Sequence, residues 1–130
     1  MKAADILNGF HAWTRLVGMK MSASNAYSLM KYARLVFEEY ELIERRRSGL
    51  VHRITGTEPG SNAEIKHGTN EFEQYVSEFS EMAEVEVSVP TFGNSLEAVL
   101  SWIPDDEKFS AQELAVLEPF FGGDDGASTN

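Results

Sequence analysis

Apolar side chains recur at alternating steps of three and four residues over residues 23–54, which is the spacing of an amphipathic helix. Eight of the nine positions in this row are apolar or aromatic and one is an arginine: Ala26, Leu29, Ala33, Val36, Tyr40, Ile43, Arg47, Leu50 and Ile54. No proline or glycine occurs in this stretch before Gly49. The pattern predicts one long helix over about 23–54, and a second element must cover its apolar row.

Two shorter segments show the same helical spacing. An N-terminal helix is expected over 3–17, where Gly9 costs about 1 kcal/mol relative to alanine and makes the helix depend on tertiary packing. Another helix is expected over about 69–83, after the strong turn signals of residues 57–62. We expect this helix to return along the long one as an antiparallel hairpin.

The predicted hairpin implies a cap for its second helix and buried side chains between its two helices. Thr69 or Asn70 is expected to cap the returning helix, because hydroxyl and amide side chains accept from the free N–H groups of a first turn. Val36 on the long helix and Phe79 on the returning helix are predicted to be buried where the two helices meet.

The period changes after the predicted hairpin. Val85, Val87 and Val89 alternate with polar residues up to Pro90, as in a half-buried β-strand. One short acidic strand is therefore predicted over about 84–90. Because a lone strand is not stable, its partner is expected in 63–67, in 96–103 or in a second subunit.

A short C-terminal helix is predicted over about 111–118, where Ser110 and Glu113 have the spacing of a capping box. The Gly- and Asp-rich residues 122–130 are predicted to form a flexible tail. Together these elements predict an α+β fold, mostly α, in a single compact domain over 1–121.

Charge is distributed unevenly along the 130 residues. Residues 1–54 hold nine basic and five acidic side chains, whereas residues 55–130 hold two basic and 16 acidic ones, for a net charge of −10. The two halves can attract each other within the hairpin or between subunits, but a simply solvated acidic half explains the same distribution. The acidic balance argues against direct nucleic-acid binding. No apolar run has the roughly 20 residues of a membrane span, so no membrane association is expected.

The chain contains no recognisable catalytic or cofactor motif. It has no cysteine, its three histidines lie far apart, and neither a Walker A nor a GxSxG sequence is present. No catalytic, cofactor-binding or metal-binding residue is predicted, and the chain is not expected to be an enzyme or to need a cofactor.

The sequence does indicate residues that could contact other proteins. The long helix carries a basic cluster near its end and more apolar side chains than one hairpin can cover, and the predicted strand has an acidic side. The contact candidates are Arg45, Arg46, Arg47 and Arg53, the apolar Tyr32 and Leu35, and the acidic Glu84 and Glu86. We expect the chain to bind itself as a homo-oligomer or to bind another protein.

Three segments, in their order and spacing, resemble a family of small, functionally unassigned proteins of tailed phages and prophages. The segments are 26–31 (AYSLMK) with Glu39 and residues 45–47 downstream, 70–87 from NEF to the acidic alternation, and 110–120 with its LAVLEPF end. The resemblance covers about 20–121. It implies a phage or prophage origin and a role in virion or tail morphogenesis.

The resulting expectation is a non-enzymatic phage structural or assembly protein that acts through helix packing and strand-mediated contacts with other phage structural proteins or with itself. The alternative is a phage-encoded acidic inhibitor of a host nuclease or defence protein, whose surface imitates nucleic acid. Synthesis is expected in the host-cell cytoplasm, with the virion as a second location.

Overall fold

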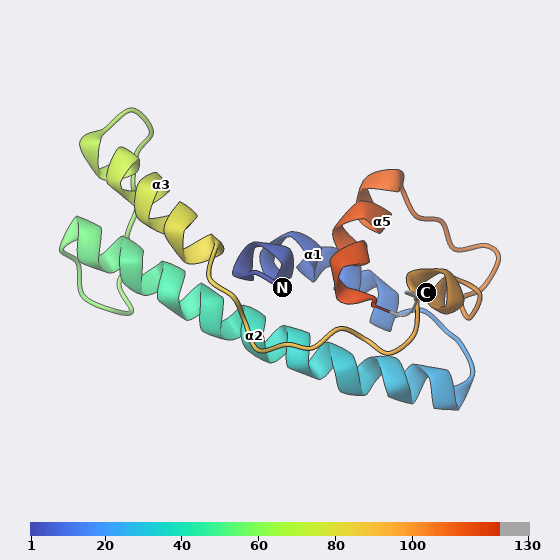
Figure 1. Cartoon of the computed structure of the whole chain (residues 1–130). Coiled ribbons are helices and arrows are strands. Elements are labelled where there is room, and N and C mark those ends of the chain that lie inside the picture. Colours follow the sequence, from blue (N-terminus) through green and yellow to red (C-terminus); the bar gives the residue numbers. More distant parts are fainter. Residues whose placement is uncertain (123–130) are drawn as a thin grey trace.

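The computed structural model describes residues 1–122, which form five α-helices and one 3₁₀ turn (Figure 1). The elements are α1 (Ala3–Val17), α2 (Ala23–Thr55), α3 (Asn70–Ala83), α4 (Leu96–Leu100), α5 (Ala111–Leu117) and the 3₁₀ turn η1 (Glu118–Phe120). The four predicted helices are confirmed, each within one residue of its expected bounds. None of the helices in residues 1–122 is long and apolar enough to cross a bilayer.

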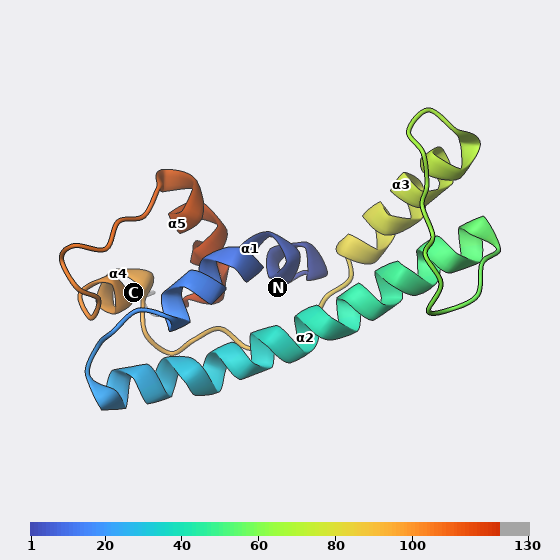
Figure 2. The ribbon, with the colours of Figure 1, turned by 180° about the vertical axis from the view of Figure 1, so that it is seen from behind.

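α2 is the axis on which the other elements are arranged. The remaining helices lie on one side of it, with α1, α4 and α5 over its N-terminal half and α3 over its C-terminal half (Figures 1 and 2). The predicted apolar row is the buried one: Leu29, Val36, Ile43 and Leu50, seven residues apart, are at most 8% exposed. Because the row continues for the whole helix, α2 needs both α1 and α3 to cover it.

The helical hairpin of α2 and α3 forms, but the interface between the two helices buries fewer side chains than expected. Gly56 ends α2 in a left-handed conformation, with φ of 71°, and Thr69 caps α3 by accepting from the Phe72 N–H. Val36 is fully buried, in a core shared with α1, whereas Phe79 is only half-buried. No residue of α3 is fully buried, because within residues 1–122 nothing packs on its outer side.

The predicted strand over 84–90 is wrong, and so is the α+β class. Residues 1–122 contain no β-strand, and the acidic segment makes one isolated antiparallel bridge, between Lys2 and Glu86. Its backbone bonds go to the start of the chain: the Ala3 N–H donates to the Val85 carbonyl at 2.9 Å. Neither 63–67 nor 96–103 pairs with it, and the latter contains α4.

Only the later part of the valine alternation packs on the helices, because Val89 is buried whereas Val85 is 47% exposed. The segment runs along α2, and Val89 and Phe92 are buried in the core (Figure 1). The hydroxyl of Tyr32 on α2 donates to the Pro90 carbonyl at 2.5 Å and so replaces a strand partner at that position. This extended segment therefore buries Val89 and Phe92 against the helices without joining a sheet.

The C-terminal segment packs across α1. The predicted capping box is confirmed, because Ser110 accepts from the Glu113 N–H while Glu113 accepts from the Ser110 N–H. Arg15 on α1 contacts the Glu113 carboxylate at 2.6 Å. Gly9, buried in α1, lies directly against the ring of Phe120, so its missing side chain lets the two segments approach. The prediction of a single domain over 1–121 stays a prediction, and the predicted tail lies outside the described residues beyond Gly122.

Candidate protein-contact surface

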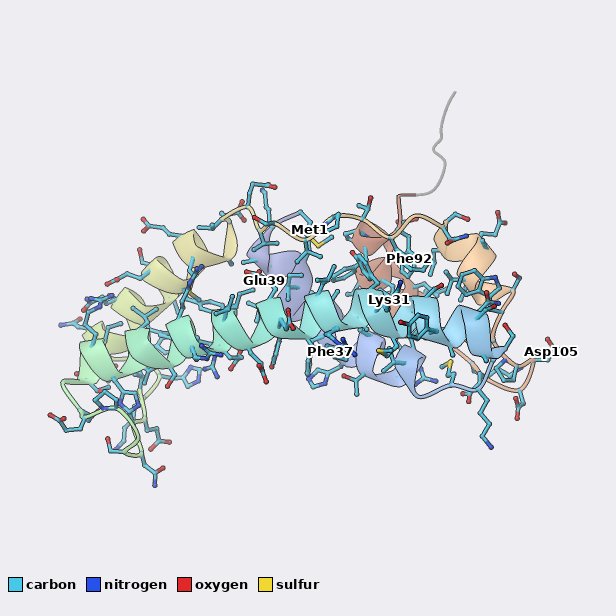
Figure 3. The ribbon with its side chains drawn as sticks, turned by 90° about the horizontal axis from the view of Figure 1, so that it is seen from below. Met1, Lys31, Phe37, Glu39, Phe92 and Asp105 are labelled. Atoms are coloured by element: carbon cyan, nitrogen blue, oxygen red, sulfur yellow. The ribbon has the colours of Figure 1, made fainter. Side chains whose placement is uncertain are left out.

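The outward face of α2 is the side that points away from the buried row. Viewed from below, α2 lies in front of the other helices, with Lys31 and Glu39 on the side toward the viewer (Figure 3). Leu35 and Leu42 are seven residues apart and therefore share one face of the helix. They are 43% and 41% exposed. Leu35 and Leu42 therefore form an exposed apolar strip that runs parallel to the axis of α2.

Charged side chains flank this strip in an ordered way. Glu38 and Glu39 precede Leu42 by four and three residues, and Arg45 and Arg46 follow it by three and four. Both arginines are exposed, and neither has a carboxylate within ion-pair distance in the described part of the chain. Along the helix axis, the outward face of α2 is thus acidic on the N-terminal side of Leu42 and basic on its C-terminal side.

At the C-terminal end of α2 the surface is hollowed into an open groove of about 520 Å³. Its lining is Arg45, Ser48, Gly49, His52, Arg53, Thr57, Pro59 and Gly60. The Nδ1 atom of His52 lies 2.7 Å from the Thr57 hydroxyl, which ties the loop to the helix. The groove continues the outward face of α2 and extends its basic side.

The predicted basic cluster divides into two groups. Arg45 and Arg46 point outward, whereas Arg47 lies in the buried row and contacts the Glu44 carboxylate at 2.6 Å. The hydrogen bonds to Glu44 and then to Tyr75 of α3 raise the pKa of Arg47. Arg47 is therefore already paired with a carboxylate of its own helix, unlike Arg45 and Arg46.

Arg53 is also used within the hairpin, where it pairs with Glu78 of α3. Gln74 and then Arg53 hold the pKa of Glu78 below its ordinary value. Five of the six ion pairs among residues 1–122 join the basic half of the chain to the acidic half, so the two halves meet within the fold, which is one of the alternatives that the sequence leaves open.

The acidic candidates have local partners as well. Glu84 accepts from the Lys2 ammonium at 2.6 Å, and Glu86 lies 3.1 Å from the amino group of Met1. The hydrogen bond to Glu84 raises the pKa of Lys2. Both carboxylates remain exposed, but they bind the first residues of the chain and not the basic cluster.

The two apolar candidates have different fates. Leu35 is exposed on the outward face of α2 as expected, whereas Tyr32 is 6% exposed and packs against Trp13. Burial raises the pKa of Tyr32. Tyr32 is thus a core residue, and its prediction as a contact residue is wrong. The structure adds Leu42, Glu38 and Glu39, which lie seven, three and four residues after Leu35 and therefore near it on the helix surface.

Comparison with protein-family models, with curated proteins and with solved structures finds no match. The resemblance to tailed-phage proteins therefore stays a prediction. Within residues 1–122 no group of three or more His, Cys, Asp or Glu side chains has the geometry to hold a metal ion.

Proposed function

We propose that the chain is a non-enzymatic structural or morphogenesis protein of a tailed phage that binds other phage structural proteins or a second copy of itself through the outward face of α2. One observation carries this proposal: Leu35 and Leu42 are exposed in line on an uncovered helix, with charges of opposite sign on either side of Leu42. The phage context comes from the resemblance of the sequence. The strand-mediated contacts are not part of the proposal, because 84–90 forms no strand.

The chemistry of the face supports a protein as its ligand. Exposed leucines favour burial against another apolar surface, while the flanking charges give such a contact direction and select its partner. The chain would be made in the host-cell cytoplasm and carried into the particle or onto an assembly intermediate.

A second candidate is an acidic inhibitor of a host nuclease or defence protein. The observation that favours it lies on the outer side of α3, where Glu73, Glu81 and Glu84 are exposed and share one face of the helix or its end. Lys2 is the only cation that contacts any of these three carboxylates in residues 1–122. A row of carboxylates can imitate the phosphates of a nucleic acid.

Mass spectrometry of purified particles distinguishes these functions. Particles are isolated from a lysate of the phage or induced prophage that carries the gene, and the chain is quantified against a known capsid protein. A structural protein is present in a constant number of copies per particle. Absence from particles would contradict the structural role and would favour an inhibitor or a transient assembly factor.

A further inference from the structure

We propose that the outward face of α2 binds the same face of a second copy of this chain, with the two α2 helices antiparallel and a two-fold axis at Leu42. This inference rests on the proposed function, because it uses the same surface, but it names the partner and the register of the contact. It also assigns a role to four charged residues on either side of Leu42.

The charge order about Leu42 is the observation that selects this arrangement. A two-fold axis between antiparallel helices places the residues that precede Leu42 in one copy opposite those that follow it in the other. Glu38 then lies on the same side as Arg45 of the second copy, and Glu39 on the same side as Arg46 of the second copy. Symmetry produces each pair twice, so the contact contains four pairs of opposite charge.

Other arrangements of two copies lose these pairs. A parallel arrangement would place Glu38 and Glu39 against the same carboxylates of the second copy, and like charges in contact oppose association. An antiparallel arrangement about Leu35 would bring Glu38 near Lys31 of the second copy but would leave Arg45 without an acidic partner. The axis at Leu42 is the one that uses all four charges.

The apolar side chains fit the same register. Leu42 meets its own copy at the axis, and Leu35, seven residues before it, comes opposite Gly49, seven residues after it. A β-carbon at Gly49 would have no atom within 4 Å, so the surface there has room for the leucine of the second copy.

At the outer ends of the contact two positively charged residues come together, and the contact area is small, so the affinity is limited. Lys31 approaches Arg53 of the second copy, but the charge of Arg53 is already compensated by Glu78. The face is narrow, and a single helix pair buries less than the roughly 1,200 Å² of a stable interface. We therefore expect a dissociation constant in the micromolar range.

Charge reversal tests the register. Sedimentation is measured across the micromolar range for the wild type, for Glu38→Arg/Glu39→Arg and for Arg45→Glu/Arg46→Glu, with circular dichroism to verify folding. Each variant alone faces like charges, so its dissociation constant should rise at least about tenfold. An equimolar mixture should form a heterodimer, because the reversed charges are complementary in both halves of the contact. The control Glu73→Arg/Glu81→Arg, on the outer side of α3, should leave the dissociation constant of the wild type unchanged.

Cysteine cross-linking tests the axis independently of the charges. The chain has no cysteine, so Leu42→Cys places one thiol on the two-fold axis, where it meets the same thiol of the second copy. Mild oxidation should give a disulfide dimer much faster than it does for Val76→Cys, which replaces a comparably exposed residue on α3.

A monomeric wild type at all concentrations would overturn the inference, as would a charge-variant mixture that does not associate, or equal cross-linking at positions 42 and 76. None of these results would contradict the proposed function if purified particles contain the chain. A wild-type dimer that never enters particles would overturn the proposed function and leave the dimer intact.

Discussion

Replacement of Gly9 by alanine should destabilise the protein, although alanine is the better helix former. A β-carbon at Gly9 would lie 2.4 Å from Cε2 and 2.9 Å from Cζ of Phe120, and 3.0 Å from the carbonyl oxygen of Val116. Phe120 is fully buried and the Val116 oxygen belongs to the backbone of α5, so neither can yield without moving the segment.

Two opposing terms determine the size of the effect. Alanine favours a helix interior by about 1 kcal/mol over glycine, and overpacking a filled core costs about 1–3 kcal/mol. Because the obstructing groups are a buried ring and the backbone, we expect a cost near the upper limit and a net loss of about 2 kcal/mol for Gly9→Ala. In a chain of this size that lowers the melting temperature by about 8 °C.

Gly49 provides a matched control. It is also inside a helix, but a β-carbon there would meet no atom within 4 Å. Gly49→Ala should therefore raise the free energy of unfolding by about 1 kcal/mol. Both variants are measured by thermal and urea denaturation, at concentrations below those at which the chain associates.

A double-mutant cycle assigns the cost of Gly9→Ala to its cause. In a Phe120→Leu background the ring is absent, so Gly9→Ala should cost less than it does in the wild type. If Gly9→Ala stabilises the protein as much as Gly49→Ala does, then η1 does not pack on α1 at this point and the reasoning is refuted.

Three further predictions concern the core and the cap of α5. Val36→Asp places a carboxylate at a fully buried position and should lower the free energy of unfolding by about 3–5 kcal/mol; an unchanged urea midpoint would show that Val36 is accessible to water. Tyr32→Phe removes the hydroxyl that donates to the Pro90 carbonyl and should cost about 1–2 kcal/mol in the same assay, whereas an equal midpoint would mean that this bond is absent. The hydrogen bond from the Ser110 N–H holds the pKa of Glu113 below its ordinary value of 4.5. Its stabilisation is therefore present above pH 4.5 and is lost as the pH falls through the folded-state pKa; Glu113→Gln should flatten the acid limb of the stability curve, and identical limbs would contradict this.

The helices could be predicted because their signals are local. The row in α2 repeats over eight turns, and even its polar member fits, since Arg47 is satisfied by Glu44 three residues earlier on the same helix. The capping box of α5 likewise needs only residues 110–113. Such features depend on neighbours in the sequence, so a pattern of residues is enough to indicate them.

The rest of the fold depends on contacts between distant residues. The alternation of Val85, Val87 and Val89 is typical of a strand, but α2 and the first residues of the chain supply its partners. Tyr32 lies off the main apolar row of α2, which predicts an exposed contact residue. It is buried because Pro90 and Trp13, on segments distant in the sequence, cover it. Nothing local distinguishes such a residue from an exposed one.

The candidate site shows the same division. Leu35 could be predicted from its position off the buried row, whereas the order of the charges about Leu42 depends on which face of α2 carries them and does not show in the charge of each half of the chain. Leu42 follows Leu35 by seven residues, and the charged residues lie three or four residues before and after Leu42, so the sequence contains the signal once the bounds of α2 are known.

The most direct test of the docking role of α2 compares two exposed apolar positions for entry into particles. Leu42 on the outward face of α2 and Val76 on α3 are 41% and 44% exposed, so Leu42→Arg and Val76→Arg should both fold with little change in stability. Each variant is expressed during particle production, and its copy number in purified particles is measured by mass spectrometry. The account predicts that Leu42→Arg is lost from particles while Val76→Arg is retained at the wild-type level. Equal retention of the two variants would show that the outward face of α2 is not the surface by which this chain binds its partners.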